Sequence, residues 1–241
     1  MHQLTTLSGA ILDPMLRADA VGPRITYYDD GSGERIELSA VTLANWAAKT
    51  GNLLRDELGA GSGSRVAILL PAHWQTAAVL FGVWWIGAEA VLDASGPADL
   101  ALCTAERLDE ADATVEPGGE VAVLSLDAFG RSAPDLPIGV TDYATAVRVH
   151  GDQIVAERHP GAALGGRSVD EILADCENSA AARGLTLRDR VLSSASWSGP
   201  AELVDGLLAV MAVGASLVQV ANPDPAALQR RVETEKVTRV L

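Results

Sequence analysis

The sequence has few of the residues that usually carry catalysis or metal binding. Its 241 residues include two cysteines, four histidines and two lysines, Lys49 and Lys236. Cys103 and Cys176 form no CxxC pair, which favours two buried, reduced thiols over a disulfide or a redox motif. The histidines form no HExxH motif and no two have a ligand spacing, so the sequence predicts no metal site.

Positive charge is also scarce. The 18 Lys and Arg residues are outnumbered by 32 Asp and Glu residues, which gives a formal net charge of −14. Such a field repels phosphate backbones and anionic lipids, so we expect no nucleic-acid partner and no membrane partner. The chain opens with no secretion signal, and no apolar run approaches the roughly 18 residues of a membrane-spanning helix. We therefore predict a cytoplasmic protein, and the preference for Arg over Lys suggests a bacterial one.

The glycine-rich loops that commonly hold nucleotides are missing as well. A Walker A loop requires GxxxxGK[ST], and the chain has no Gly-Lys pair. The GSG segments at 31–33 and 61–63 lack the third glycine of GxGxxG, so we interpret both as turns. We therefore expect no cofactor.

Aliphatic runs of strand length are the main positive feature. Hydrophobic residues make up 48% of the chain and aromatic residues only 4%. VAILL at 66–70 has turn residues on both sides, a helix over about 74–86 ends at Gly87, and EAVLD at 89–93 is the next strand. Continuous apolar runs of this kind are typical of strands that are covered on both faces of a parallel sheet.

A second strand–helix–strand run follows between residues 190 and 220, after a Pro- and Gly-rich link. The sequence therefore predicts an α/β fold with two stacked, mainly parallel-sheet halves, residues 1–155 and 156–241, packed as one rigid unit. Within the first half, VRVHGDQIV at 147–155 suggests a β-hairpin. Trp84 and Trp85 are adjacent in a helix and point in different directions, so we expect one in the core and the other near a surface or interface.

Six segments in a fixed order resemble the adenylate-forming superfamily, which includes acyl-CoA synthetases. They are SRVAILLP, an aromatic-rich helix and GAEAVLD, and much later DRVLS, GLLAVMAVGA and KVTRVL. Each alone is a buried strand or helix pattern, whereas their order is fairly specific to that fold. The resemblance implies the large domain of acyl-CoA synthetases, without the C-terminal domain.

The catalytic segments of that superfamily have no counterpart in this chain. Its phosphate loop, of the TSGTTG-x-PK type, is replaced by HPGAALGGRSVDE at 159–171, which has glycines and Arg167 but no lysine. The aromatic–His pair that helps shape the superfamily's acyl pocket corresponds to Ser198 and Gly199. The resemblance therefore implies the fold without the residues for adenylation, and we assign no catalytic residue.

The loop after DRVLS is the best candidate for a ligand pocket. Ser194, Ser196, Trp197, Ser198 and Gly199 follow a predicted parallel strand, and α/β sheets bind ligands at the carboxyl ends of such strands. The loop does not match the GxSxG spacing of a serine nucleophile. Its alternative interpretation is an N-cap loop for the helix that follows.

Three functions remain open. The first is a non-catalytic remnant of an adenylate-forming large domain that acts as a binding or assembly protein. The second is a small enzyme with different chemistry, and the third is an acyl-adenylating subunit completed in trans by a partner. We also expect a homo-oligomer or a protein partner that covers residues 216–241, because the strand KVTRVL presents backbone and apolar side chains.

Overall fold

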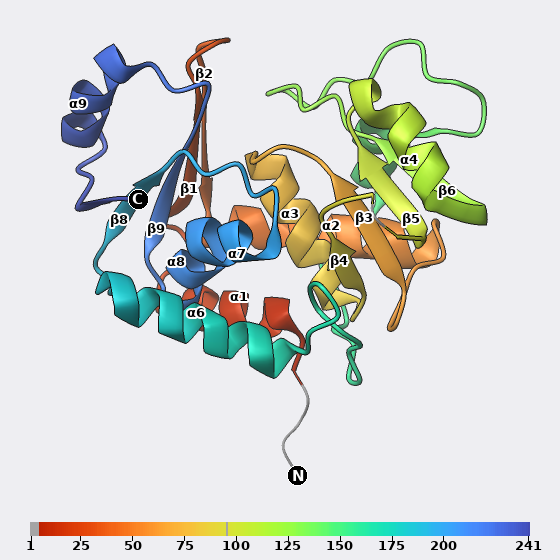
Figure 1. Ribbon diagram of the computed structural model, residues 1–241, viewed down its shortest axis with the longest axis horizontal. Coiled ribbons are helices and arrows are strands. Elements are labelled where there is room, and N and C mark those ends of the chain that lie inside the picture. The colour runs from red at the N-terminus through yellow and green to blue at the C-terminus, as the bar shows by residue number, and fades with distance from the viewer. Residues whose placement is uncertain (1–4, 95) are drawn as a thin grey trace.

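The computed structural model describes residues 5–94 and 96–241, which form two five-stranded sheets with helices between and around them (Figure 1). Residues 1–4, where the predicted first half begins, and Ser95 lie outside the described residues. The predicted α/β architecture with mainly parallel sheets is confirmed.

The first sheet, sheet A, has the strand order β10-β8-β9-β1-β2. β1 and β2 form an antiparallel hairpin, and the other neighbours are parallel. The sheet therefore combines a hairpin from the start of the chain with strands from its end. The strands are β1 (Pro23–Asp29), β2 (Glu34–Ser39), β8 (Arg190–Ser193), β9 (Ser216–Ala221) and β10 (Arg239–Val240).

The second sheet, sheet B, has the order β4-β3-β5-β6-β7, and all its neighbouring strands are parallel. The chain passes from β4 to β5, on the other side of β3, and the described residues 92–94 and 96–97 form no helix there. The strands are β3 (Arg65–Leu69), β4 (Glu89–Val91), β5 (Ala98–Cys103), β6 (Val115–Val123) and β7 (Thr141–Asp142).

Helices begin and end where local chemistry favours it. Thr6 and Ser39 cap the first two long helices. Ser168 and Glu171 form a capping box at the start of a third, and Gly184 ends that helix in the left-handed conformation. The α-helices are α1 (Leu7–Ala18), α2 (Ala40–Asp56), α3 (Trp74–Trp85), α4 (Leu108–Thr114), α5 (Tyr143–Ala146), α6 (Val169–Arg183), α7 (Pro200–Leu203), α8 (Ala209–Ala212) and α9 (Pro225–Thr234). A π-helical turn, Val204–Leu208, joins α7 to α8.

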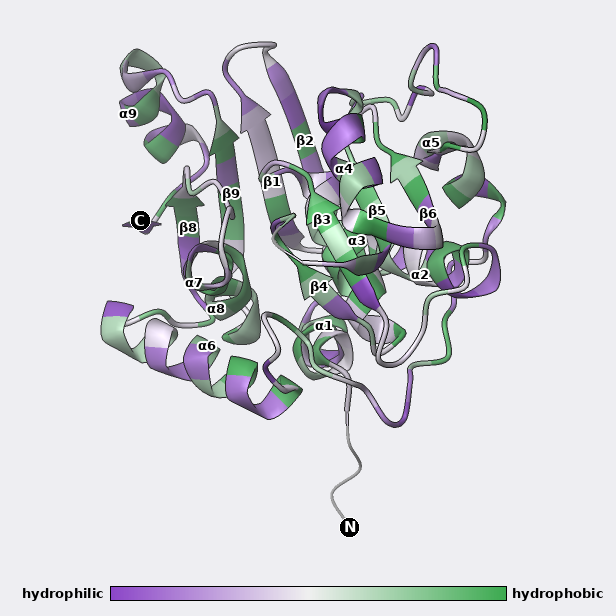
Figure 2. Cartoon of the chain, turned by 45° about the vertical axis from the view of Figure 1, so that its right-hand side comes forward, coloured by the Kyte–Doolittle hydropathy of each residue, from purple (hydrophilic) through white to green (hydrophobic). Residues whose placement is uncertain are grey.

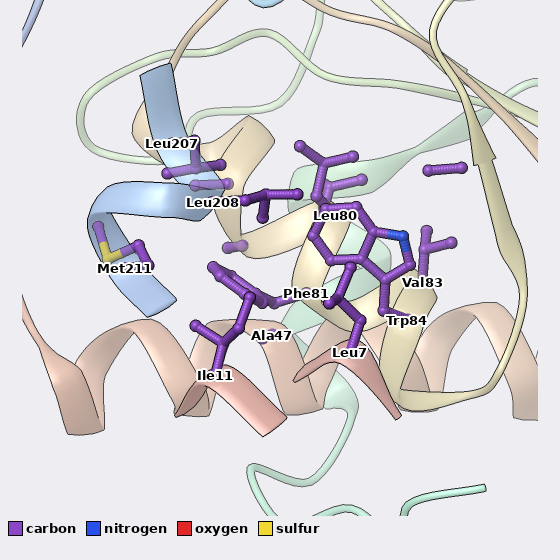
Figure 3. Packing of buried hydrophobic residues seen from close by; sticks show 14 of the residues in the cluster. Leu7, Ile11, Ala47, Leu80, Phe81, Val83, Trp84, Leu207, Leu208 and Met211 are labelled. Carbon is purple, nitrogen blue, oxygen red and sulfur yellow. The ribbon is translucent and has the colours of Figure 1, made fainter. Parts of the chain in front are cut away.

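α3 is buried on every side, because it lies in the middle of the molecule against α1, α2 and both sheets. Its core neighbours include Leu7 of α1 and Leu208 of the π turn (Figure 3). The expectation that Trp84 or Trp85 lies near a surface is therefore wrong, since they are only 1% and 7% exposed. The indole N–H of Trp84 donates to the Ala163 carbonyl at 2.8 Å.

The segment 147–155 is not a hairpin, contrary to the prediction. It begins with a 3₁₀ turn, Val147–Val149, and then runs in irregular conformation along α2. Lys49 donates to the His150 carbonyl at 2.6 Å, and Asn52 donates to the Gly151 and Gln153 carbonyls. Side chains of α2 thus bind carbonyls that a strand partner would otherwise satisfy.

Buried residues from both parts of the chain form one large hydrophobic cluster. The division of the chain into 1–155 and 156–241 stays a prediction, and the boundary between the sheets does not follow it, because residues 23–39 belong to sheet A. β9, within the predicted partner surface 216–241, lies inside the sheet, whereas β10 lies at its edge.

α2 and α3 cross at two glycines. A Cβ added at Gly82 would lie 2.8 Å from the Thr50 Cβ, 2.9 Å from the Ala47 carbonyl oxygen and 3.0 Å from the Gly51 nitrogen. Two of these three neighbours are backbone atoms of α2, which cannot move without moving the helix. The absence of a side chain therefore sets the separation of the two helices.

We expect Gly82→Ala to lower the free energy of unfolding by about 2 kcal/mol. Overpacking typically costs about 1–3 kcal/mol, and the better helix propensity of alanine, about 1 kcal/mol, offsets only part of it. Urea unfolding followed by circular dichroism measures the change. Gly61→Ala is the control, because nothing lies within 4 Å of its added Cβ, and a stability at or above wild type for Gly82→Ala would contradict the crossing argument.

An ionic network ties the end of α9 to the outer face of sheet A. Glu235 is buried and accepts hydrogen bonds from Tyr28, Arg190 and Arg35, the last at 3.0 Å. Burial raises the pKa of its carboxyl, but these hydrogen bonds outweigh it and hold the pKa at about 2. Arg231 of α9 likewise pairs with Asp30 at the end of β1.

The network predicts acid sensitivity. Because the pKa of Glu235 falls from the usual 4.5 to about 2 on folding, its contribution is complete above about pH 4.5 and is lost as pH falls toward 2. We expect Glu235→Gln to cost about 3 kcal/mol at pH 7, and the gap from wild type to close near pH 2. Unfolding curves at several pH values test this, with the exposed Glu233→Gln of the same helix as control. A pH-independent gap would show that the ionised carboxylate is not its source.

Candidate functional site

In the loop after β8, two serines bind the same carboxylate of the next helix. The hydroxyls of Ser196 and Ser198 both donate to the carboxylate of Glu202, at 2.6 and 3.0 Å, and the Ser198 amide donates to it at 3.2 Å. The hydrogen bond from Ser196, followed by those from Ser198, lowers the pKa of Glu202. Gly199 is the N-cap residue of α7. This N-cap has no side-chain hydrogen bond to the helix backbone. The capping interpretation and a ligand pocket formed by Ser194 and its neighbours therefore both stay predictions.

Trp197 differs from the serines around it, because it is only 3% exposed. Its φ is +57°, and its indole N–H has no hydrogen-bond partner within the described part of the chain. The ring lies against Gly206 of the π turn, where an added Cβ would be 3.2 Å from the indole nitrogen. Gln219 of β9 donates to the Ala195 carbonyl at 3.0 Å, which attaches the same loop to sheet A. The one signal in the sequence that points to Gln219 is its place as a polar residue within an apolar strand.

The segment at the place of the superfamily's phosphate loop is a tight turn. Leu164 and Arg167 pair with each other, and between them Gly165 and Gly166 have φ values of +57° and +74°. Positive φ at both central residues is typical of a two-residue type I′ hairpin turn. The Gly166 amide donates to the carboxylate of Glu89 at 2.6 Å. A carboxylate of the chain itself, which also pairs with Arg65 at 3.6 Å, therefore occupies an amide of this turn.

A mainly apolar cavity of about 340 Å³ lies on another side of the molecule, between β2, α2, α3, α5 and residues 128–130. The rings of Trp46 and Trp74 meet edge to face there, with centroids 6.1 Å apart. Its lining also includes the polar side chains of Glu37, Thr42, Gln75 and Arg148. Its apolar lining includes Ile36, Leu38, Trp46, Trp74, Ala78 and Ala144.

A buried histidine precedes the helix that contributes Trp74 to the cavity. His73 is 2% exposed, and its Nδ1 accepts from the Gln75 amide at 3.1 Å as the N-cap of α3. Burial lowers the pKa of His73 to about 3, so the ring is neutral and carries its proton on Nε2, which lies 3.7 Å from the Glu34 carboxylate. The Trp74 indole N–H donates to the same carboxylate at 3.4 Å. His73 and Glu34 thus position Trp74 at the cavity.

The sequence does not predict this cavity. Trp46 and Trp74 stand at helical spacing among apolar residues and are typical of core positions. Only the packing of α2 beside α3 and β2 places both indoles around one space. The position of His73 directly after a parallel strand and its closing proline is the one signal that could have directed attention there.

The described residues offer no alternative centre of metal or thiol chemistry. In 5–94 and 96–241, no three His, Cys, Asp or Glu side chains lie together in a way that could hold a metal ion. Cys103 and Cys176 are both fully buried, and burial raises the pKa of their thiols to about 11 and about 12. They are therefore protonated and unreactive at neutral pH. Among the helices described, none is long and apolar enough to cross a membrane.

Solved structures with the same fold are acyl-CoA synthetases. An acyl-CoA synthetase from Brucella canis matches 98% of this chain with a TM-score of 0.80 and 20% identity, and the anthranilate CoA ligase AuaEII matches all of it with a TM-score of 0.75 and 16% identity. The N-terminal domain of FACL13 from Mycobacterium tuberculosis matches 98% with a TM-score of 0.70 and 18% identity. The chain spans 46%, 50% and 62% of these three chains, respectively.

No protein-family model matches the sequence. A protein of Mycobacterium tuberculosis (strain H37Rv), named a TIGR03089 family protein, is 80% identical over 240 residues, which cover 98% of each chain. At this identity and coverage the two proteins share one family, whereas the solved structures establish the fold alone. The chain therefore belongs to the TIGR03089 family and has the fold of acyl-CoA synthetase large domains.

Proposed function

We propose that this protein is a non-catalytic binding protein that holds a small, mainly apolar molecule in the cavity beside Trp46 and Trp74. The observation that carries this proposal is the cavity itself, whose mainly apolar lining includes two indoles that meet edge to face and a few polar side chains. Ligand sites are typically concave and lined by apolar and aromatic side chains, with a few polar groups that fix orientation.

The size of the cavity limits the ligand. About 340 Å³ is near the lower end of the roughly 300–1,000 Å³ typical of small-molecule sites, so one or two fused rings or a short branched chain would fill it. Gln75 is partly committed, since its amide donates to the Asp127 carbonyl at 3.0 Å. Arg148, which donates to the Gly130 carbonyl, keeps further N–H groups for a polar end of the ligand.

The turn at residues 164–167 supports a function without adenylation. Stabilisation of the transition state in phosphoryl and adenylyl transfer depends on positioned donors and positive charge around the phosphates. In this chain the Gly166 amide is bound by Glu89, and Arg167 pairs with Asp175. The amide is therefore occupied, and the charge of Arg167 is balanced by a carboxylate of the chain.

We expect the fluorescent probe 1-anilinonaphthalene-8-sulfonate to bind the native protein at one site and to quench tryptophan fluorescence. Ala144→Leu should fill the cavity and weaken probe binding at least tenfold, because Ala144 lines it. Ala182→Leu is the matched control, since Ala182 is exposed on α6, away from the cavity. Equal probe affinity in the two variants, with both folded by circular dichroism, would show that the cavity is not the binding site.

We also expect no ATP–pyrophosphate exchange with any carboxylic acid in a panel of aliphatic and aromatic acids. The physical reason is the closed turn and the carboxylate of Glu89 at the place of the phosphate loop. The measurement is incorporation of labelled pyrophosphate into ATP, with an acyl-CoA synthetase as positive control. Exchange above the buffer blank would instead favour an adenylating enzyme.

A further inference from the structure

β2 presents an unpaired edge. It is the last strand of sheet A, next to β1 (Figure 2), and the described residues place no strand on its outer side. The six residues of β2, Glu34–Ser39, are longer than β10 at the opposite edge, where only Arg239–Val240 pair with the sheet. An edge of this length is a template for pairing with another strand unless it is covered.

We propose that two copies of this chain associate by antiparallel pairing of β2 with β2, centred on Ile36. A two-fold axis perpendicular to the sheet would join the two A sheets into one continuous sheet. Such an isologous contact requires the strand to be complementary to itself.

The charge pattern of the strand selects this register. Side chains that face each other across the pair must lie on the same face of the sheet, so the centre falls on a residue. With Ile36 at the centre, Arg35 of each copy lies opposite Glu37 of the other, which gives two opposite-charge pairs. Centres at Arg35 or Glu37 would place like charges directly opposite each other, which is unfavourable.

An exposed apolar side chain accompanies the cavity at this strand. Phe129, 80% exposed, lines the same cavity as Ile36 and Leu38. Apolar surface beside an unpaired edge is typical of a surface that another chain covers, and the self-complementary charges favour a second copy as that chain.

Cysteine cross-linking tests the pairing directly. Ile36→Cys would place one thiol of each copy at the two-fold axis, where directly opposite Cβ atoms are about 4.5–5.5 Å apart, close enough for a disulfide. Oxidation should then give a cross-linked dimer on a non-reducing gel, with little background because Cys103 and Cys176 are buried. Val240→Cys is the control at the other edge. A cross-link through Val240→Cys and none through Ile36→Cys would overturn the proposal.

Charge-reversal variants provide a second test, which also reports whether the variants are folded. We expect wild type to sediment as a dimer at about 100 μM, and Arg35→Glu and Glu37→Arg to be monomers, because each places like charges across the pair. An equimolar mixture of the two variants should sediment as a heterodimer, since every pair is then complementary. Arg35 also bonds Glu235, and a variant that had lost its fold would not assemble in the mixture. Monomeric wild type, or a mixture that stays monomeric while both variants are folded, would refute the pairing.

Discussion

The close crossing of α2 and α3 is the constraint on which the rest of the molecule depends. Gly51 and Gly82 bring the two backbones together, and α3 then lies deep enough to contact α1, α2 and both sheets. One hydrophobic cluster can therefore cover residues from the first strands to the last. The same crossing brings Trp46 of α2 beside Trp74 of α3, so the shape of the cavity follows from the absence of two side chains.

The turn at 164–167 is closed by contacts within the chain. The surrounding strands and helices keep the arrangement of acyl-CoA synthetases, with TM-scores of 0.70 to 0.80 against such structures. A short turn at the surface between packed elements does not disturb that core. Glu89 then satisfies the Gly166 amide, which leaves the turn stable without a bound anion.

Much of the fold follows from local patterns in the sequence. The parallel strands and the turn between β1 and β2 depend on neighbouring residues, and both are found as predicted. The burial of both Trp84 and Trp85 and the irregular path of 147–155 depend on tertiary packing, which periodicity does not contain. The cavity also depends on tertiary packing, because only packing brings together the elements that line it. The sequence shows that the loop at Ser194–Gly199 follows a parallel strand. The contacts of Ser196 and Ser198 with Glu202 depend on the fold of that loop and do not follow from the sequence pattern.

β2 links the cavity to the free edge of sheet A. Ile36, Glu37 and Leu38 line the cavity and also belong to the strand whose outer edge is unpaired. A strand placed beside β2 would restrict the motion of these residues, and a ligand against them would restrict the strand in turn. If a ligand binds monomer and dimer with different affinities, it must shift the association equilibrium, and association must change its affinity by the same factor. Binding and assembly would then be two properties of one strand.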